Sequence, residues 1–220
     1  TGRSRCDACD APLSPLALVP IVSYFFLQGR SLCCGARLSA FSPITEMLLG
    51  GLFALSYSSL GMTLALPFFL ISLSLLLALV LYDLAHQILP SPLLALFVVT
   101  SAVTRFSVSP SIPEFSFSLI TAFFIAAFLA LIHFASRGRA MGLADAPLAF
   151  GLALLVGPSA PTGFMFSFWI GTVIGTLLLA MRPRGSRMGV EVPFAPYLAA
   201  GFLLAYFTQW NIAAFITGSP

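Results

Sequence analysis

After the first forty residues, long apolar segments alternate with short polar connections along the chain. Seven such segments can be delimited, at residues 43–60, 62–82, 90–104, 115–135, 145–156, 164–181 and 193–210. Most approach the about 20 residues that cross a bilayer core as a helix, and they lack the alternation of apolar and polar residues typical of barrel strands. Pro43, Pro147 and Pro193 stand near predicted helix starts, where proline's missing N–H is tolerated. The pattern predicts an all-α polytopic membrane protein with about seven transmembrane helices.

The composition excludes most soluble classes of protein. Of the 220 residues, 59% are hydrophobic and 8% are charged, whereas soluble domains carry about a quarter of their residues as charge. So few charges cannot coat a water-facing surface. The chain is therefore not expected to be a cytosolic globular enzyme, a nucleic-acid binder or a disordered regulator, and its expected surroundings are membrane lipid.

Residues 1–40 differ from the rest, with arginines and all four cysteines among mixed residues, and their apolar run at 16–27 is too short to span a bilayer. We expect a small extramembrane module at 1–40 and a transmembrane domain at 41–220. Because the chain opens with Thr1 and has no charged-then-apolar leader, we also expect an excerpt or a processed product. The cysteines form two pairs, Cys6 with Cys9 and Cys33 with Cys34, a pattern typical of a structural zinc site, with free thiols as the alternative.

The arginines predict the orientation in the membrane. With seven spans, nine of the ten arginines fall on one side, and only Arg105 falls on the other. Connections rich in arginine stay in the cytoplasm. The cysteine module and the connections at 83–89, 135–143 and 182–192 are thus predicted to be cytoplasmic, and the C-terminus external. The nine are Arg3, Arg5, Arg30, Arg37, Arg137, Arg139, Arg182, Arg184 and Arg187.

Two aspartates are the main candidates for chemistry. Asp83 ends the second apolar segment and Asp145 opens the fifth, so both are predicted at the cytoplasmic edge although 62 positions separate them. Two close carboxyls can share one proton, the arrangement with which aspartic proteases activate water. The alternatives are that Asp145 caps the helix containing Pro147 and that Asp83 is an ordinary interfacial carboxylate.

For three further polar residues, a structural role is the favoured interpretation. His86 is expected to be an interfacial anchor, and His133 a residue hydrogen-bonded within its helix. Glu46 is expected in the first turn after Pro43, where a carboxylate suits the helix dipole.

These features, taken in order along the chain, resemble the prepilin peptidase family, also called type IV leader peptidases, which are GxGD-type aspartyl membrane proteases. The matching segments are SRCDAC, LVPIVSYFFLQGR, CCGARLS, SPITEMLLG, YDLAHQILP, GLAD with LAFGLALLVG, and VPFAPYLAAG. The resemblance implies that Asp83 and Asp145 are the catalytic pair and that Cys6, Cys9, Cys33 and Cys34 form the family's cysteine module. It also implies a multi-pass protein of the bacterial inner membrane that removes the leader of prepilin-like proteins at the cytoplasmic face. Many members with this module then methylate the new N-terminus with S-adenosylmethionine.

The chain departs from the family pattern at four places. Ala144 stands for the second glycine of GxGD, Pro147 for a usual lysine, and Ser91 for an acidic residue. Ser31 stands at the third cysteine position, with Cys33 displaced beside Cys34. Ala144 and Pro147 keep open a second hypothesis, a relative that binds pilin-like or secretion-system proteins without cleaving them. A third hypothesis, from the transport class, treats Asp83 and Asp145 as a relay for protons or cations.

Overall fold

The computed structural model describes residues 5–6, 8–12, 24–139, 141–181 and 193–209. Each of the seven predicted apolar segments contains a helix, so the all-α prediction is confirmed for these residues. The helices are α2 (Phe41–Leu60), α3 (Ala65–His86), α4 (Ser91–Val108), α5 (Ile112–Ala135), α6 (Asp145–Val156), the 3-10 turn η2 (Gly157–Ser159), α7 (Ala160–Met181) and α8 (Ala195–Thr208).

The number of membrane spans matches the prediction only roughly. Within the described ranges, four stretches are long and apolar enough to cross a bilayer: α3, α4, α5 and the continuous stretch Asp145–Leu178. That last stretch joins α6 to α7 through η2, where Gly157 has a positive φ of 67°. The short α8 is a further apolar helix. The helices and the composition together make this chain an integral membrane protein.

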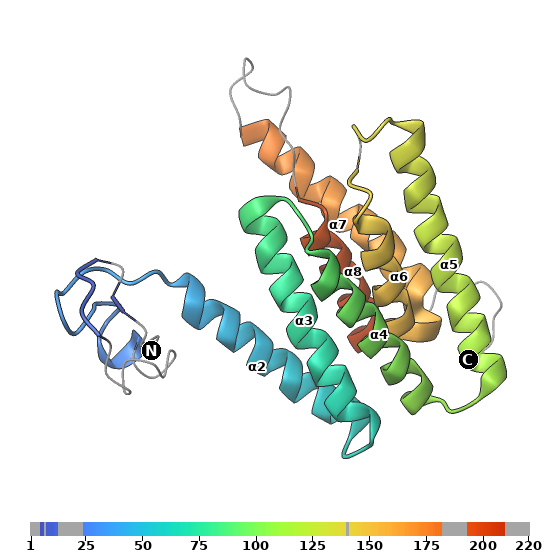
Figure 1. The fold of residues 1–220 in the computed structure, drawn as a ribbon, viewed down its shortest axis with the longest axis horizontal. Coiled ribbons are helices and arrows are strands. Elements are labelled where there is room, and N and C mark those ends of the chain that lie inside the picture. The colour runs from blue at the N-terminus through green and yellow to red at the C-terminus, as the bar shows by residue number, and fades with distance from the viewer. Residues whose placement is uncertain (1–4, 7, 13–23, 140, 182–192, 210–220) are drawn as a thin grey trace. The chain divides into compact units, whose positions relative to one another are not determined.

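The chain divides into two compact units, Thr1–Leu55 and Ser56–Pro220. The structural division thus lies within α2, whereas the predicted domain boundary at residue 40 follows the change in composition. In the larger unit, α6 occupies the middle, packing against α4, α5, α7 and α8 (Figure 1). Ten of its twelve residues are buried, which explains why a helix too short to span a membrane can be apolar on every side.

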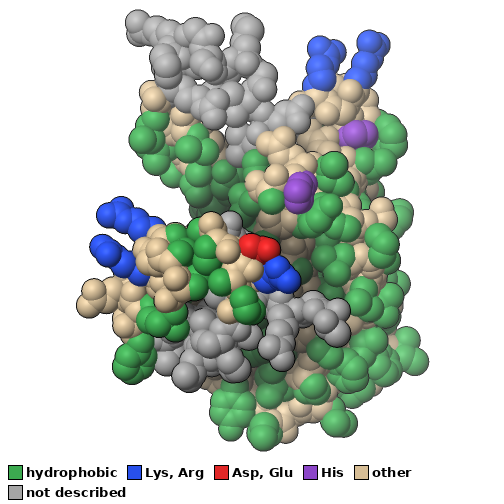
Figure 2. Space-filling model, turned by 60° about the vertical axis from the view of Figure 1, so that its left-hand side comes forward, with side chains coloured by type: hydrophobic (Ala, Val, Ile, Leu, Met, Phe, Trp, Pro, Cys, Tyr) green, Lys and Arg blue, Asp and Glu red, His purple; other side chains and the backbone are tan. Residues whose placement is uncertain are grey.

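Helix α5 illustrates how the outer helices divide their surfaces. Its inward positions are Ser118, Ala122, Ile125 and Leu129, and the two small residues among them, Ser118 and Ala122, let it approach its neighbours closely there. Large side chains on its other face are exposed, among them Phe117, Phe123, Phe124 and Phe134. Hydrophobic side chains cover much of the surface in view in Figure 2. Such exposure fits a lipid environment, as expected for a membrane protein.

The short connection between α3 and α4 determines which residues lie at each end of the larger unit. Only residues 87–90 separate these helices, and the helices pack against each other, so they run antiparallel (Figure 1). Asp83, near the end of α3, therefore lies at the opposite end of the unit from Arg105, near the end of α4. Arg105 is buried, and its Nε donates to Ser118 Oγ at 2.9 Å.

Candidate active site and metal centre

Asp83 lies in the last turn of α3 and is buried, with 6% of its surface exposed. Its carboxyl accepts a hydrogen bond from the backbone N–H of Ala195, the first residue of α8. The other oxygen, Oδ2, is buried without a hydrogen-bond partner among the described residues. A carboxylate opposes the dipole of its own helix at a C-terminus, but the N-terminus of α8 offers the compensating positive end. Asp83 is therefore a specifically held group, contrary to the ordinary interfacial alternative.

Asp145 is the first residue of α6 and is also buried, with 7% exposed. The alternative that it caps α6 is wrong, because the capping position is Ala144 and no side-chain cap bond forms there. The carboxyl instead turns back and accepts a hydrogen bond from the backbone N–H of Gly142. Gly142 lies directly beside this carboxyl, since a Cβ there would be in van der Waals contact with Asp145 Oδ2 at 3.4 Å.

The two aspartates lie close enough in the folded chain for their charges to influence each other. The charge of Asp83 acts on the carboxyl of Asp145, and α8, whose first residue binds Asp83, packs against both α3 and α6. Two buried carboxyls thus lie near each other at one end of the larger unit, and each accepts a hydrogen bond from a backbone amide. A pair of this kind can hold a water molecule and move its proton.

The remaining polar candidates lie elsewhere or differ from expectation. His86 is exposed and its ring lies tilted at 45° against that of Tyr82, at 4.6 Å between ring centroids, as an anchor at the end of α3 would. Glu46 is not in the first turn of α2, because the helix begins at Phe41, whose N–H donates to Ser39 Oγ. His133 is hydrogen-bonded, but outside its helix: Nδ1 lies 2.8 Å from the carbonyl oxygen of Met141.

The four cysteines come together through two loops with the same backbone hydrogen bonds. In the first loop, Cys6 N–H donates to Ala11 O, and Asp10 N–H donates to Cys6 O. In the second, Ser31 N–H donates to Ala36 O, and Gly35 N–H donates to Ser31 O. Asp10 and Gly35, at equivalent places, both have positive φ. The structure thus makes Ser31 the counterpart of Cys6, and Cys34 the counterpart of Cys9.

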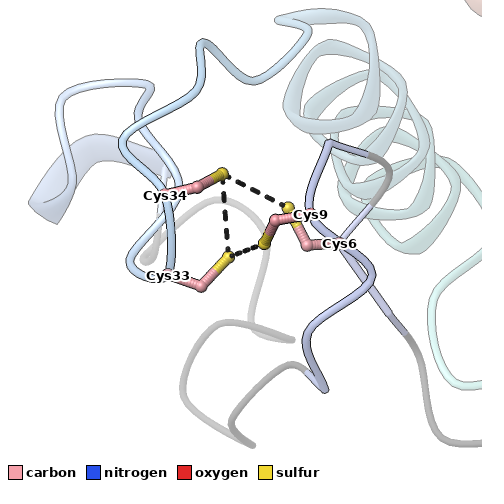
Figure 3. A group of neighbouring side chains, drawn as sticks. All are labelled: Cys6, Cys9, Cys33 and Cys34. Atoms are coloured by element: carbon pink, nitrogen blue, oxygen red, sulfur yellow. Dashed lines mark hydrogen bonds between the residues drawn. The ribbon is translucent and has the colours of Figure 1, made fainter.

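The displaced Cys33 still reaches the cluster. The four sulfur atoms lie within 4.8 Å of one another, and Figure 3 shows them converging from the two loops. The Sγ atoms of Cys6 and Cys34 are 3.8 Å apart, those of Cys33 and Cys34 3.9 Å, and those of Cys9 and Cys33 3.1 Å. Tetrahedral zinc with bonds of about 2.3 Å to sulfur places its sulfurs about 3.8 Å apart. The donor set and its spacing therefore fit a metal ion.

Ser31 supports the cluster as a hydrogen-bonding neighbour. Its Oγ lies 3.0 Å from the sulfur of Cys33 and 3.5 Å from that of Cys6. The Ser31 hydroxyl and then the backbone amide of Ala8 lower the pKa of Cys6 to about 6. Contact with Cys33 chiefly raises the pKa of Cys9 to about 12. Thiolates are the form that binds metal, and Ser31 favours that form at Cys6.

Sequence reasoning missed the start of α8 and the contact of His133 as parts of the site. Pro193 and Pro196 flank Ala195, and prolines at a helix start were the available signal for a helix N-terminus. That this N-terminus meets the end of α3 depends on packing. The partner of His133 lies eight residues away in a connection of irregular structure, for which periodicity offers no signal.

Comparison with known proteins agrees with the resemblance on both parts of the chain. The model of the Bacterial Peptidase A24 N-terminal domain matches residues 1–60, which include the cysteine cluster. The model of the Type IV leader peptidase family matches residues 69–180, which include Asp83 and Asp145. The chain belongs to the type IV leader peptidase family. The predicted family is thus confirmed.

Curated relatives of this family match nearly the whole chain. A protein of Bacillus subtilis (strain 168) is 30% identical over 97% of this chain and 84% of its own length. A Legionella pneumophila protein is 29% identical over 93% of this chain and 72% of its own length. One from Pseudomonas aeruginosa is 28% identical, over 91% and 70% respectively. Each is named prepilin leader peptidase/N-methyltransferase. No solved structure matches the chain significantly.

Proposed function

We propose that this member of the type IV leader peptidase family is a prepilin leader peptidase in which Asp83 and Asp145 are the catalytic pair. The observation that carries the proposal is the proximity of two buried, electrostatically interacting carboxyls at the end of α3 and the start of α6, in a chain with very few acidic residues. Buried ionisable groups in a membrane protein are costly and point to function. The names of the relatives supply the reaction class.

In the proposed reaction, the two carboxyls bind one water molecule and share one proton. The ionised carboxyl takes a proton from the water as it attacks the scissile carbonyl, and the protonated carboxyl donates a hydrogen bond to the carbonyl oxygen. The N–H groups of Ala195 and Gly142 hold the two aspartates during this step. When the intermediate collapses, the proton gained from water passes to the leaving amine.

The substrates we propose are prepilin-like proteins, cleaved at the cytoplasmic face of the bacterial inner membrane. The connection before Asp145 contains Arg137 and Arg139, both exposed, and cytoplasmic connections are rich in such residues. Asp83 and Asp145 lie at the same end of the larger unit as these arginines. If this end faces the cytoplasm, the peptidase can reach a leader that remains in the cytoplasm.

For the cysteine cluster we propose a structural zinc ion held by Cys6, Cys9, Cys33 and Cys34. The convergence of four sulfurs supports it, in a segment where Cys6 is the buried hydrophobic residue among the described positions before α2, and zinc would supply folding free energy to that segment. Because the relatives' names include N-methyltransferase, we also propose methylation of the new N-terminus, with S-adenosylmethionine as the methyl donor. We assign no residue to that second activity.

The deciding experiment is cleavage of a prepilin-like substrate by the purified full chain, followed by mass spectrometry of the product. We expect one cut that removes the leader, and none with Asp83→Asn or Asp145→Asn. Glu46→Gln is the matched control, since it also removes one carboxylate charge near a helix start, and it should lower the rate less than either aspartate substitution. A folded protein that binds the substrate without cutting it would support the non-catalytic hypothesis instead.

A transport role is tested separately in liposomes. Both aspartates lie at one end of the larger unit, not along a path through it, which argues against a proton or cation relay. The proteoliposomes should show no flux above empty vesicles. Flux that disappears with Asp83→Asn would favour the transporter hypothesis.

A further inference from the structure

His133 connects the end of α5 to the segment that leads into Asp145. It lies in the last turn of α5, half-buried, with Nδ1 2.8 Å from the carbonyl oxygen of Met141. A carbonyl oxygen can only accept a hydrogen bond, so Nδ1 carries the proton in this contact. The neutral ring is then the Nδ1–H tautomer.

The oxygen that His133 binds belongs to the same peptide unit as the amide that binds Asp145. The carbonyl of Met141 and the N–H of Gly142 are the two polar groups of one planar peptide. The N–H donates to the Asp145 carboxyl, and the oxygen accepts from His133. Because the unit is planar and trans, fixing its oxygen also fixes the direction of its N–H. A hydrogen bond at the oxygen also polarises the peptide and strengthens its N–H as a donor.

The chain around His133 restrains the imidazole ring. After α5 the backbone turns, with Gly138 N–H donating to the carbonyl of His133 at 2.8 Å. Gly138 has a positive φ of 75°, and a Cβ there would lie 3.3 Å from the ring. The ring of Phe134 lies edge-on at 5.4 Å between centroids. These contacts hold the ring in the direction of Met141.

We propose that His133 is a positioning residue for Asp145, acting through the Met141–Gly142 peptide. The inference rests on the proposed peptidase function, because it gives His133 a role in the same cleavage. His133 touches neither carboxyl in this arrangement. It orients the amide that orients Asp145, and so sets where that carboxyl stands relative to the water and to Asp83.

The test compares two substitutions that place an amide donor differently. In His133→Asn the side-chain NH₂ stands as many bonds from Cα as Nδ1 does, so it can still reach Met141 O. In His133→Gln the side-chain NH₂ is one bond farther from Cα, at the position that Nε2 occupies in histidine. We expect kcat for leader cleavage to fall by about tenfold to a hundredfold with Gln and also with Leu, the size of effect that misplaced catalytic groups produce. With Asn it should stay within about threefold of wild type.

The Michaelis constant and a control separate positioning from folding. KM should change little in all three variants, because His133 is not proposed to touch the substrate. His86→Leu, at the other, exposed histidine, should cleave at the wild-type rate. Equal kcat for the Asn and Gln variants, or near wild-type kcat for His133→Leu, would overturn the proposal.

Hydrogen–deuterium exchange provides a readout that needs no activity. The Gly142 amide should exchange faster in His133→Leu and His133→Gln than in wild type, and at the wild-type rate in His133→Asn. Unchanged exchange in folded His133→Leu would overturn the link between His133 and this amide. Failure of the peptidase function would look different: wild type would not cleave the substrate, while exchange at Gly142 would still decide the hydrogen-bond link.

Discussion

At the scale of the residue, two carboxyls at the site depend on single backbone amides. Asp83 is held by Ala195 and Asp145 by Gly142, and Oδ2 of Asp83 has no partner among the described side chains and amides. A buried oxygen without a hydrogen-bond partner lowers the free energy of unfolding, so a purely structural carboxylate is rarely left in this state. Oδ2 of Asp83 is therefore available to a water or a substrate group, as the proposed reaction requires.

The first prediction concerns how the two aspartates act together. Asp83→Asn and Asp145→Asn should each lower cleavage below detection, and the double substitution should be no worse than either, because residues that act as one unit are strongly non-additive. Substrate binding should largely survive, since asparagine is nearly isosteric with aspartate. Cleavage rates and substrate affinities of the two single variants and of the double variant test this prediction. Independent, multiplicative losses would mean that the two carboxyls have separate roles.

At the scale of the element, helix α8 is held by a very close approach to α7. A Cβ added to Gly201 would lie 2.3 Å from the backbone nitrogen of Ser167, and one at Gly163 would lie 2.8 Å from Cα of Phe202. Small residues let membrane helices pack backbone to backbone in this way. Since the first residue of α8 also binds Asp83, this packing positions part of the site.

We therefore expect Gly201→Ala to destabilise the larger unit by about 1–3 kcal/mol, because the added methyl group would overlap the backbone of α7. Thermal unfolding in detergent should show a lower midpoint, and leader cleavage should fall with it because α8 would shift from Asp83. Gly175→Ala, in α7, is the control. A Cβ at Gly175 meets nothing within 4 Å, so its midpoint should not fall. Equal midpoints for the two variants would contradict the packing argument.

The two cysteine loops allow a prediction about the displaced ligand. The purified protein should contain one zinc per chain, and Cys33→Ser should lose most of it because the sulfur of Cys33 completes the tetrahedral set. Ser31→Ala should keep the metal, since Ser31 only donates a hydrogen bond to the cluster. Elemental analysis of the wild type and of both variants measures the zinc content per chain and tests this prediction. Zinc well below one per chain in the wild type would favour free thiols.

At the scale of the whole molecule, the two ends of the larger unit differ in their charged residues, and this difference predicts the orientation in the membrane. Arg105 and the aspartates lie at opposite ends of the larger unit, in agreement with the separation that the arginine count predicts. Arg105 itself is buried, so the labelling of a cysteine introduced there would depend on its burial as well as on the side of the membrane on which it lies. Arg184, on the predicted cytoplasmic side, lies outside the described residues. Exposed positions near each end are better reporters.

We expect Ile112→Cys to react with a membrane-impermeant maleimide in intact cells, because Ile112 is 78% exposed and directly follows the connection after α4. Arg137→Cys should react only after the cells are made permeable. The four native cysteines are predicted to be cytoplasmic, so the unmodified chain is the background control. Labelling of Arg137→Cys in intact cells would reverse the orientation and separate the aspartates from a cytoplasmic substrate.

The sequence by itself determined the class of protein, the helices and the chemical candidates. Apolar length and scarce charge fix a helical membrane protein, because unpaired backbone groups and bare charges are too costly in lipid. Local proline positions marked helix starts near Pro147 and Pro193, and motifs in order pointed to the family. Asp83 and Asp145 stood out because few acidic residues exist in so apolar a chain.

Only the tertiary structure decided what holds those candidates. The contact of Ala195 with Asp83 joins residues more than a hundred positions apart, and no local pattern encodes it. Asp145 does not form the helix cap that the sequence offered as an alternative but accepts a bond from Gly142, and His133 binds Met141 in place of the bond expected within its helix. In each case a side chain had several possible partners nearby, and the packing of α5, α6 and α8 selected one. Periodicity specifies which face of a helix is apolar, whereas a hydrogen bond depends on where two backbones meet.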